Sequence, residues 1–225
     1  PNMNNTIDSW KKSDVFQSQL SLNLKELSSE NTYPSHWLSF LGLVNSFQPK
    51  TILDVGCGCG AYYELCKRHL DIEYTGIDYA KEAIELAKQT WSYDNFIVKD
   101  YKELTSEYVQ GFDLVHAGAM FDVLPNGDEA LEFVMSLKPH SLLIGRMKLT
   151  DNESYYNRYI AYDSIETCEF YHNTNNFFKI CLKYNYSIDQ VSDSFYLRSK
   201  KNESIFRTIQ CLVIKIWKTI MIQSR

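Results

Sequence analysis

The stretch TILDVGCGCG, residues 51–60, constrains the fold of this chain more than any other segment. Ile52, Leu53 and Val55 are typical of a buried strand, and the alternating glycines that follow let the backbone turn sharply and approach a ligand closely. Asp54 interrupts the apolar run, and a carboxylate in that position needs a structural or functional reason. The segment therefore predicts a buried strand that runs into a glycine loop.

Apolar strands and amphipathic helices alternate through most of the chain. After the opening strand, strands are expected at residues 74–78, 96–98, 112–117 and 141–145, and helices at residues 14–28, 34–47, 61–70, 81–90 and 128–137. This alternation predicts an α/β fold with a doubly wound, mostly parallel sheet. Two extended runs, 187–198 and 205–217, flank a turn-prone SKKNES segment. They predict a C-terminal hairpin that adds an antiparallel edge and brings the sheet to seven strands.

Composition narrows the class of protein. The 225 residues suffice for one α/β domain, and with 44% hydrophobic and 23% charged residues the chain is expected to be globular. A net charge of −5 argues against sequence-independent binding to a nucleic-acid backbone, which would require a basic surface. Six cysteines without a secretory signal predict thiols in the cytoplasm, and no apolar run is long enough to span a membrane. Because the first residue is Pro1, the chain is also compatible with one domain of a longer polypeptide.

The glycine pattern resembles motif I of the class I S-adenosylmethionine (SAM) dependent methyltransferases. Its spacing is G-x-G-x-G, whereas dinucleotide-binding folds use G-x-G-x-x-G. The resemblance extends from about residue 33 to residue 217. It implies SAM as cofactor and S-adenosylhomocysteine (SAH) as product. It also implies a helical cap at residues 1–32, a SAM-binding domain at residues 33–225 and a tyrosine-rich insertion on the acceptor side at residues 150–173.

The resemblance assigns the donor contacts to the ends of three successive strands. Asp54 is expected to hold the ammonium end of SAM, with a carboxylate that caps a helix or braces the loop as the alternative. Asp78, about 20 residues beyond Gly58, is expected to accept both ribose hydroxyls, with a surface carboxylate as the alternative. Asp100 corresponds to the acid that meets the adenine amino group, and Tyr79 and Tyr101 are expected to flank the adenine ring. The loop residues of the predicted donor site are Gly56, Cys57, Gly58 and Gly60.

A metal site is not expected at the glycine loop. Cys57 and Cys59 alternate with the glycines, but two ligands are too few for a structural zinc ion, and no second Cys/His set has suitable spacing. These cysteines are interpreted as loop positions that tolerate a small side chain.

The acceptor side is less constrained. His116, Asp122 and His172 are equal candidates for a general base, and each also has a structural interpretation, as a core hydrogen-bonding residue, a turn cap and a helix cap respectively. Arg146, just beyond the fifth strand, is a candidate to bind an anionic acceptor group, with a surface ion pair as the alternative. Aromatic rings at a pocket mouth hold sugars, aryl groups or ammonium groups. The candidate rings are Tyr155, Tyr156, Tyr159 and Tyr171.

Together these features predict a metal-independent methyltransferase that modifies an O or N atom of a small molecule, sugar or lipid head group. The fourth strand is not followed by the Asn/Asp-Pro-Pro-aromatic sequence of enzymes that methylate exocyclic amino groups of nucleic acid bases. The alternative from another class is a non-catalytic, methyltransferase-like domain that binds the nucleoside and serves as a scaffold or regulatory module.

Overall fold

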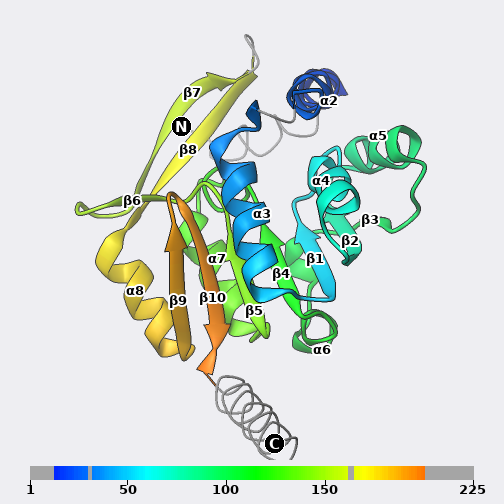
Figure 1. Ribbon diagram of the computed structural model, residues 1–225. Helices are drawn as coiled ribbons and strands as arrows, with labels where there is room; N and C mark the ends of the chain where they lie inside the picture. The colour runs from blue at the N-terminus through cyan, green and yellow to red at the C-terminus, as the bar shows by residue number, and fades with distance from the viewer. Residues whose placement is uncertain (1–12, 30–31, 162–164, 201–225) are drawn as a thin grey trace, which may run out of the picture.

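A central sheet with helices on both faces organises the molecule (Figure 1). The computed structural model describes residues 13–29, 32–161 and 165–200. Within them, the strands of the central sheet are β1 Thr51–Val55, β2 Glu73–Asp78, β3 Phe96–Val98, β4 Leu114–Ala117, β5 Ser141–Ile144, β9 Tyr186–Val191 and β10 Ser194–Ser199. Their order is β3-β2-β1-β4-β5-β10-β9, with β10 antiparallel to both neighbours and the other pairs parallel. The predicted doubly wound, mostly parallel sheet is confirmed.

The helices follow the predicted alternation. They are α2 Ser13–Leu27, α3 Ser35–Phe47, α4 Ala61–His69, α5 Lys81–Trp91, α6 Ser106–Gln110, α7 Gly127–Ser136 and α8 Thr174–Lys183, with a short 3-10 helix, η2 Tyr101–Glu103. None of the described helices is long and apolar enough to cross a membrane. In the same part of the chain the cysteines are buried thiols, as expected.

Successive residues of each strand point into two separate cores. Leu53 of β1 and Val115 of β4 pack in the core that α7 and α8 cover, whereas Ile52 and Leu114 pack in the core that α3, α4 and α5 cover. Side chains alternate between the faces of a strand, so Asp54 lies on the same face as Ile52. The acid of the glycine motif therefore points towards the layer of α3 and α4.

The C-terminal hairpin lies earlier in the chain than predicted. The sequence pattern assigned one strand to residues 187–198, but the structure folds that run into both β9 and β10, and Ser194 pairs with Val191 across the turn. Ser192 has a φ of 55°, the left-handed conformation that tight hairpin turns require. Apolar and aromatic residues continue on both sides of Ser192 and Asp193, so the sequence pattern does not reveal this short turn. The second predicted strand, 205–217, lies outside the described residues.

The tyrosine-rich segment, in which no clean period was found, forms a second sheet. Its strands are β6 Lys148–Thr150, β7 Tyr155–Ala161 and β8 Ile165–Asn173, with β8 in the middle. Tyr155 and Tyr171 pair across β7 and β8, and their rings stack with centroids 4.9 Å apart. Figure 1 shows β7 and β8 as a ribbon that extends from the central sheet past the N-terminal end of α3. The division at residues 32 and 33 into cap and domain stays a prediction.

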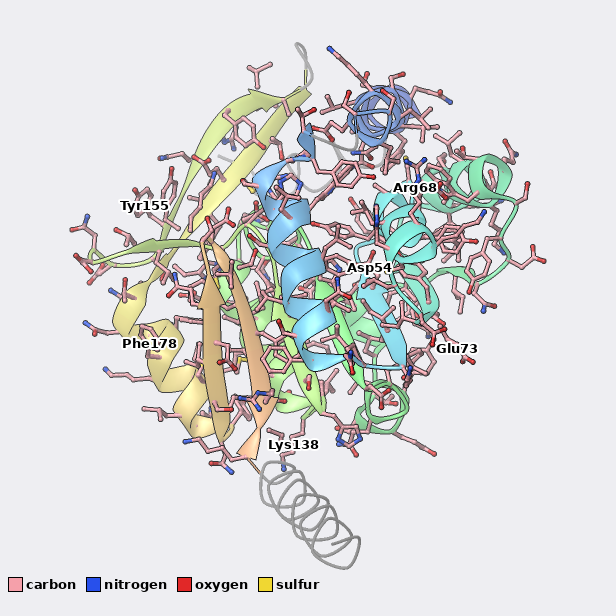
Figure 2. All side chains as sticks on the ribbon, in the orientation of Figure 1. Asp54, Arg68, Glu73, Lys138, Tyr155 and Phe178 are labelled. Atoms are coloured by element: carbon pink, nitrogen blue, oxygen red, sulfur yellow. The ribbon has the colours of Figure 1, made fainter. Side chains whose placement is uncertain are left out.

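Substitutions at the neighbouring residues Phe177 and Phe178 test how α8 packs against the core. Phe177 is fully buried and packs on Phe195 with ring centroids 5.0 Å apart, whereas Phe178 is 39% exposed on α8 (Figure 2). Phe177→Ala is expected to lower the free energy of unfolding by about 3–5 kcal/mol, because it removes a buried ring and leaves a cavity. Phe178→Ala is expected to change it by less than about 1 kcal/mol. Urea unfolding measures both, and equal losses would contradict this packing.

Candidate functional site

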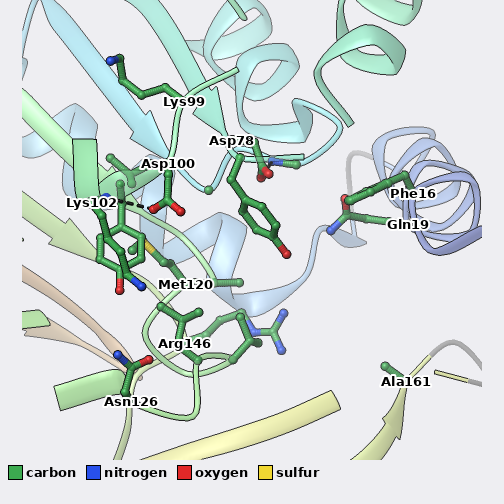
Figure 3. Close-up of a pocket in the computed structure, with 18 of the residues that line it drawn as sticks. Phe16, Gln19, Asp78, Lys99, Asp100, Lys102, Met120, Asn126, Arg146 and Ala161 are labelled. Carbon is green, nitrogen blue, oxygen red and sulfur yellow. Dashed lines mark hydrogen bonds between the residues drawn. The ribbon is translucent and has the colours of Figure 1, made fainter. Parts of the chain in front are cut away.

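A cavity of about 410 Å³ opens at the carboxyl ends of the parallel strands, the edge at which open α/β sheets bind ligands (Figure 3). Its volume lies in the range of small-molecule sites, roughly 300–1,000 Å³. The wall is built from α2, the glycine loop, the segments that follow β2, β3, β4 and β5, and the end of β7. Six of the predicted donor residues belong to this wall: Gly56, Gly58, Asp78, Tyr79, Asp100 and Tyr101.

Asp78, the last residue of β2, connects the glycine loop to the start of α5. Its Oδ2 accepts the N–H of Gly58 at 3.0 Å, and its Oδ1 accepts the N–H of Ala80 at 2.9 Å. Burial raises the pKa of Asp78 to about 6, although the two backbone hydrogen bonds lower it in part. Each carboxylate oxygen has a second lone pair, so both can also accept hydrogen bonds from a ligand in the cavity.

Helix α2 holds the glycine loop from the other side through Cys59. The N–H of Cys59 donates to Oε1 of Gln19 at 3.3 Å, its carbonyl oxygen accepts Nε1–H of Trp91 at 2.7 Å, and its thiol lies 3.4 Å from the carbonyl oxygen of Phe16. Phe16 and Gln19 also line the cavity (Figure 3). The sequence predicts α2 as part of an N-terminal helical cap, but it does not single out Phe16 or Gln19 as site residues. The available signal was Gln19, a polar residue directly before the apolar position Leu20.

Arg146 lines the cavity across from Asp78 and Asp100 (Figure 3). It follows β5 with a φ of 56°, a left-handed backbone conformation that is uncommon for a residue with a side chain. Its Nε lies 3.7 Å from Oδ2 of Asp122, which is 2% exposed. Burial raises the pKa of Asp122 to about 6, and the positive charge of Arg146 opposes that rise.

Residues 52–140 match a family model described as a methyltransferase domain. This segment of the chain is therefore similar to methyltransferase domains. The matched segment begins in β1 and ends just before β5, so it covers the glycine loop and the strand ends that carry Asp78 and Asp100. No sequence among curated proteins matches the chain.

Solved methyltransferase structures share the fold of this domain at low sequence identity. A SAM-dependent methyltransferase from Methanosarcina mazei has a TM-score of 0.52 over 66% of this chain and 92% of that chain, with 16% identity. The sugar N-methyltransferase KedS8 from Streptoalloteichus has a TM-score of 0.54 over 79% and 92%, with 10% identity. The N-terminal domain of EvdMO1 with SAH bound has a TM-score of 0.53 over 73% and 81%, with 12% identity. These likenesses concern the fold.

The end of the cavity that carries Asp78 and Asp100 is built from fixed polar groups and an aromatic ring. Asp78 is fixed as described, and Asp100 is fixed because its Oδ1 accepts the N–H of Lys102 at 3.0 Å and caps η2. Tyr101 is half-buried and packs edge-on against Phe133, with ring centroids 5.9 Å apart. The structure thus places two rigid carboxylates and an oriented ring around one cavity. Their contacts with the cofactor stay predictions.

Three other predicted donor residues are not part of the cavity wall: Asp54, Cys57 and Gly60. Asp54 is 1% exposed in the interior (Figure 2). Its Oδ2 accepts the hydroxyl of Tyr74 at 2.5 Å, and its Oδ1 lies 2.7 Å from Nδ1 of His116. Cys57 is buried in the core beside α3, and a Cβ atom on Gly60 would lie 2.6 Å from the ring of Phe96. The predicted contact between Asp54 and the ammonium group stays a prediction, while its hydrogen bonds explain a carboxylate inside the strand.

The three candidate bases lie in different surroundings. The ring of His116 pairs with Asp54 and packs against the rings of Phe40 and Tyr62, with centroids 4.7 and 4.4 Å away. His172 is fully buried, and its Nδ1 lies 2.6 Å from Oδ1 of Asp128. Asp122 contacts Arg146, which lines the cavity. None of these three described residues is among those that line the cavity, and which of them acts as a base stays a prediction.

The predicted acceptor tyrosines divide into two groups. Tyr159 of β7 lines the cavity and is 37% exposed. Tyr155 and Tyr171 stack on each other, and the hydroxyl of Tyr171 donates to Oε2 of Glu169 at 2.7 Å, so these rings stabilise the ribbon. Tyr156 is half-buried and is not among the cavity residues. In the described part of the chain, no group of three or more His, Cys, Asp or Glu residues is arranged to hold a metal ion.

Tyr74→Phe tests the network around Asp54. It is expected to lower the free energy of unfolding by about 1–3 kcal/mol, because a buried carboxylate loses one of its donors. Tyr63→Phe on α4 is the control, since its partly exposed ring packs at the edge of the same core. Urea unfolding measures stability, and calorimetry measures SAH affinity. A larger loss of SAH affinity than of stability would show that Asp54 acts mainly on the cofactor.

The pKa of Asp78 predicts a pH dependence of cofactor binding. SAH affinity is expected to fall as the pH is lowered from about 7.5 through about 6, because a protonated carboxyl accepts fewer hydrogen bonds. The sign for stability is opposite. The folded-state pKa lies above the ordinary value of 3.8, so the ionised group costs stability above about pH 6, and this cost disappears towards about pH 4. Asp78→Asn should remove both effects in calorimetry and urea unfolding, and an unchanged pH profile in that variant would contradict the assignment.

Proposed function

We propose that the domain transfers the methyl group of SAM to an O or N atom of a small-molecule, sugar or lipid-head-group acceptor, without a metal ion. The observation that most supports this proposal is the single cavity with two differently built ends. Asp78 and Asp100 lie at the donor end, and Arg146 and Tyr159 at the other end. Both substrates of a methyl transfer must share one site because the methyl group passes directly between them.

Bound SAM would supply an electrophilic methyl group on a sulfonium, with SAH as the leaving group. Asp78 and Asp100 hold the nucleoside, and the absence of side chains at Gly56 and Gly58 allows the cofactor to approach the backbone. Apolar residues such as Met120 exclude water from the space between donor and acceptor. A hydroxyl or ammonium acceptor must lose a proton, and a positioned base would receive it; His116, Asp122 and His172 stay the candidates for that role.

Two structural neighbours guide the choice of acceptors for an assay. KedS8 is described as a sugar N-methyltransferase, and the N-terminal domain of EvdMO1 was solved in the presence of SAH and D-fucose. Because their identities to this chain are 10% and 12%, they motivate a panel of sugars without assigning one. The net charge of −5 further favours a small acceptor over nucleic acid.

The second candidate is a non-catalytic domain that binds the nucleoside as a scaffold or regulatory module. One observation favours it: His116 and His172 are each already paired with a carboxylate, at 2.7 and 2.6 Å. Incubation with methyl-labelled SAM and a panel of hydroxylated and amino sugars separates the two proposals. Labelled product supports the methyltransferase, whereas SAH binding without any labelled product supports the second candidate.

Asp78→Ala tests the donor site directly. Calorimetry with SAH is expected to show a loss of about 1.5–3 kcal/mol, which corresponds to roughly 10–150-fold, because the variant removes a charged hydrogen-bond acceptor. Asp94→Ala is the matched control, since Asp94 is an exposed carboxylate beyond the end of α5 and outside the cavity. If the wild-type protein binds neither SAM nor SAH, or if Asp78→Ala binds SAH unchanged, the proposed donor site is wrong.

A further inference from the structure

Arg146 is held by its backbone in a position that carries a conformational cost. A non-glycine residue in the left-handed region costs of order 1 kcal/mol or more, and such residues cluster at ligand-binding sites. Both neighbours are fixed: the N–H of Gly145 donates to the carbonyl oxygen of Ala117 at 3.0 Å, and the N–H of Met147 donates to that of Asp193 at 2.9 Å. The φ of 56° at Arg146 is therefore imposed by β4 on one side and by the β9–β10 turn on the other.

The charge of Arg146 lies where several elements converge on the acceptor end. It contributes to lowering the pKa of His36 on α3 to about 4, after the larger effect of burial. It also opposes the burial-driven rise in the pKa values of Tyr62 on α4 and Tyr159 on β7. A single guanidinium thus acts on groups from α3, α4 and β7, and Arg146 itself lines the cavity.

The charges on the cavity wall are divided between its two ends. At the donor end, the carboxylates of Asp78 and Asp100 are accompanied by Lys99 and Lys102. At the acceptor end, the charge on the described part of the wall comes from Arg146. Asp122 lies behind it at 3.7 Å from Nε, which is an ion-pair distance rather than a hydrogen-bond distance. Asp122 balances the guanidinium through space, and its Oδ1 has no hydrogen-bond partner.

We propose that Arg146 recognises an acidic group on the acceptor, so that the substrate is a small molecule carrying a carboxylate or phosphate. This inference rests on the proposed methyl transfer and adds the chemical class of the acceptor. The planar guanidinium suits both anions because it donates two parallel hydrogen bonds. Asp122 is a positioning residue in this arrangement, since it lies 3.7 Å from the Nε of Arg146, on the buried side of the guanidinium.

The first test uses inorganic phosphate and acetate as probes on protein saturated with SAH. Each anion is titrated while the Nε–Hε resonance of Arg146 is followed by NMR, and that signal is identified by its loss in Arg146→Gln. A saturable shift with either anion supports the proposal, and the stronger of the two distinguishes phosphate from carboxylate recognition. If neither phosphate nor acetate gives a saturable shift, the proposed role of Arg146 is wrong.

The second test compares matched compounds, glucuronate with glucose and glycerol phosphate with glycerol, as ligands of the SAH complex. The acidic member of at least one pair is expected to bind more tightly, and Arg146→Gln is expected to weaken it about tenfold or more while changing the neutral member less than about twofold. Arg146→Lys should lie between, because it keeps the charge without the planar fork. Equal binding within both pairs, or a preference that survives Arg146→Gln, would overturn the proposal.

Two controls separate this inference from the proposed function. Arg158→Gln makes the same charge change on β7, where Arg158 pairs with Glu166 at 2.8 Å, and it should keep the preference for the acid. SAH affinity of Arg146→Gln, measured by calorimetry, should remain within about twofold of wild type because the donor carboxylates are untouched. Normal SAH binding without acid preference contradicts the acceptor class alone, whereas loss of SAH binding in the wild-type protein contradicts the donor site.

Discussion

A buried carboxylate, Asp78, joins two of the segments that form the cavity wall. Asp78 accepts N–H groups from Gly58 and from Ala80, and it thereby fixes the glycine loop against the start of α5. The parallel pairing of β1 with β2 brings these parts together, since Asp54 pairs with Gly76 and the strands end side by side. Cys59 then extends the arrangement to α2. These few polar contacts hold the glycine loop, the start of α5 and α2 together on one side of the cavity.

The residues that share the cavity wall with Asp78 could in large part be predicted from sequence because their signals are local. The glycine loop and the acids at the ends of β2 and β3 are each read within a few residues of a strand, and the structure brings Asp78, Asp100 and their neighbouring tyrosines to one cavity. The chain between β5 and α8 offered no such signal. Cross-strand pairs such as Tyr155 with Tyr171 stabilise it, and the pattern of one strand does not reveal its partner.

Residues that the chain brings together over long distances were the hardest to assign. Asp54 and His116 are 62 positions apart, and only the pairing of β1 with β4 makes them neighbours. A carboxylate in the glycine motif and a histidine on a strand each had a functional interpretation when considered separately. Together they form a buried pair in the core beside α3. Arg146 and Asp122 are also distant in sequence, but their ion pair connects a buried acid to a residue of the cavity wall.

The position of β10 in the sheet decides when the outer edge of β5 gains a strand partner. β10 lies between β5 and β9, so the outer edge of β5 has no strand partner until residues 194–199 have been synthesised. During translation, the strands that carry the donor loop leave the ribosome first, and the ribbon of β7 and β8 follows while β5 is still an open edge. The pairing of β10 with β5 therefore depends on residues late in the sequence. The β9–β10 turn, which precedes β10, also holds the backbone next to Arg146.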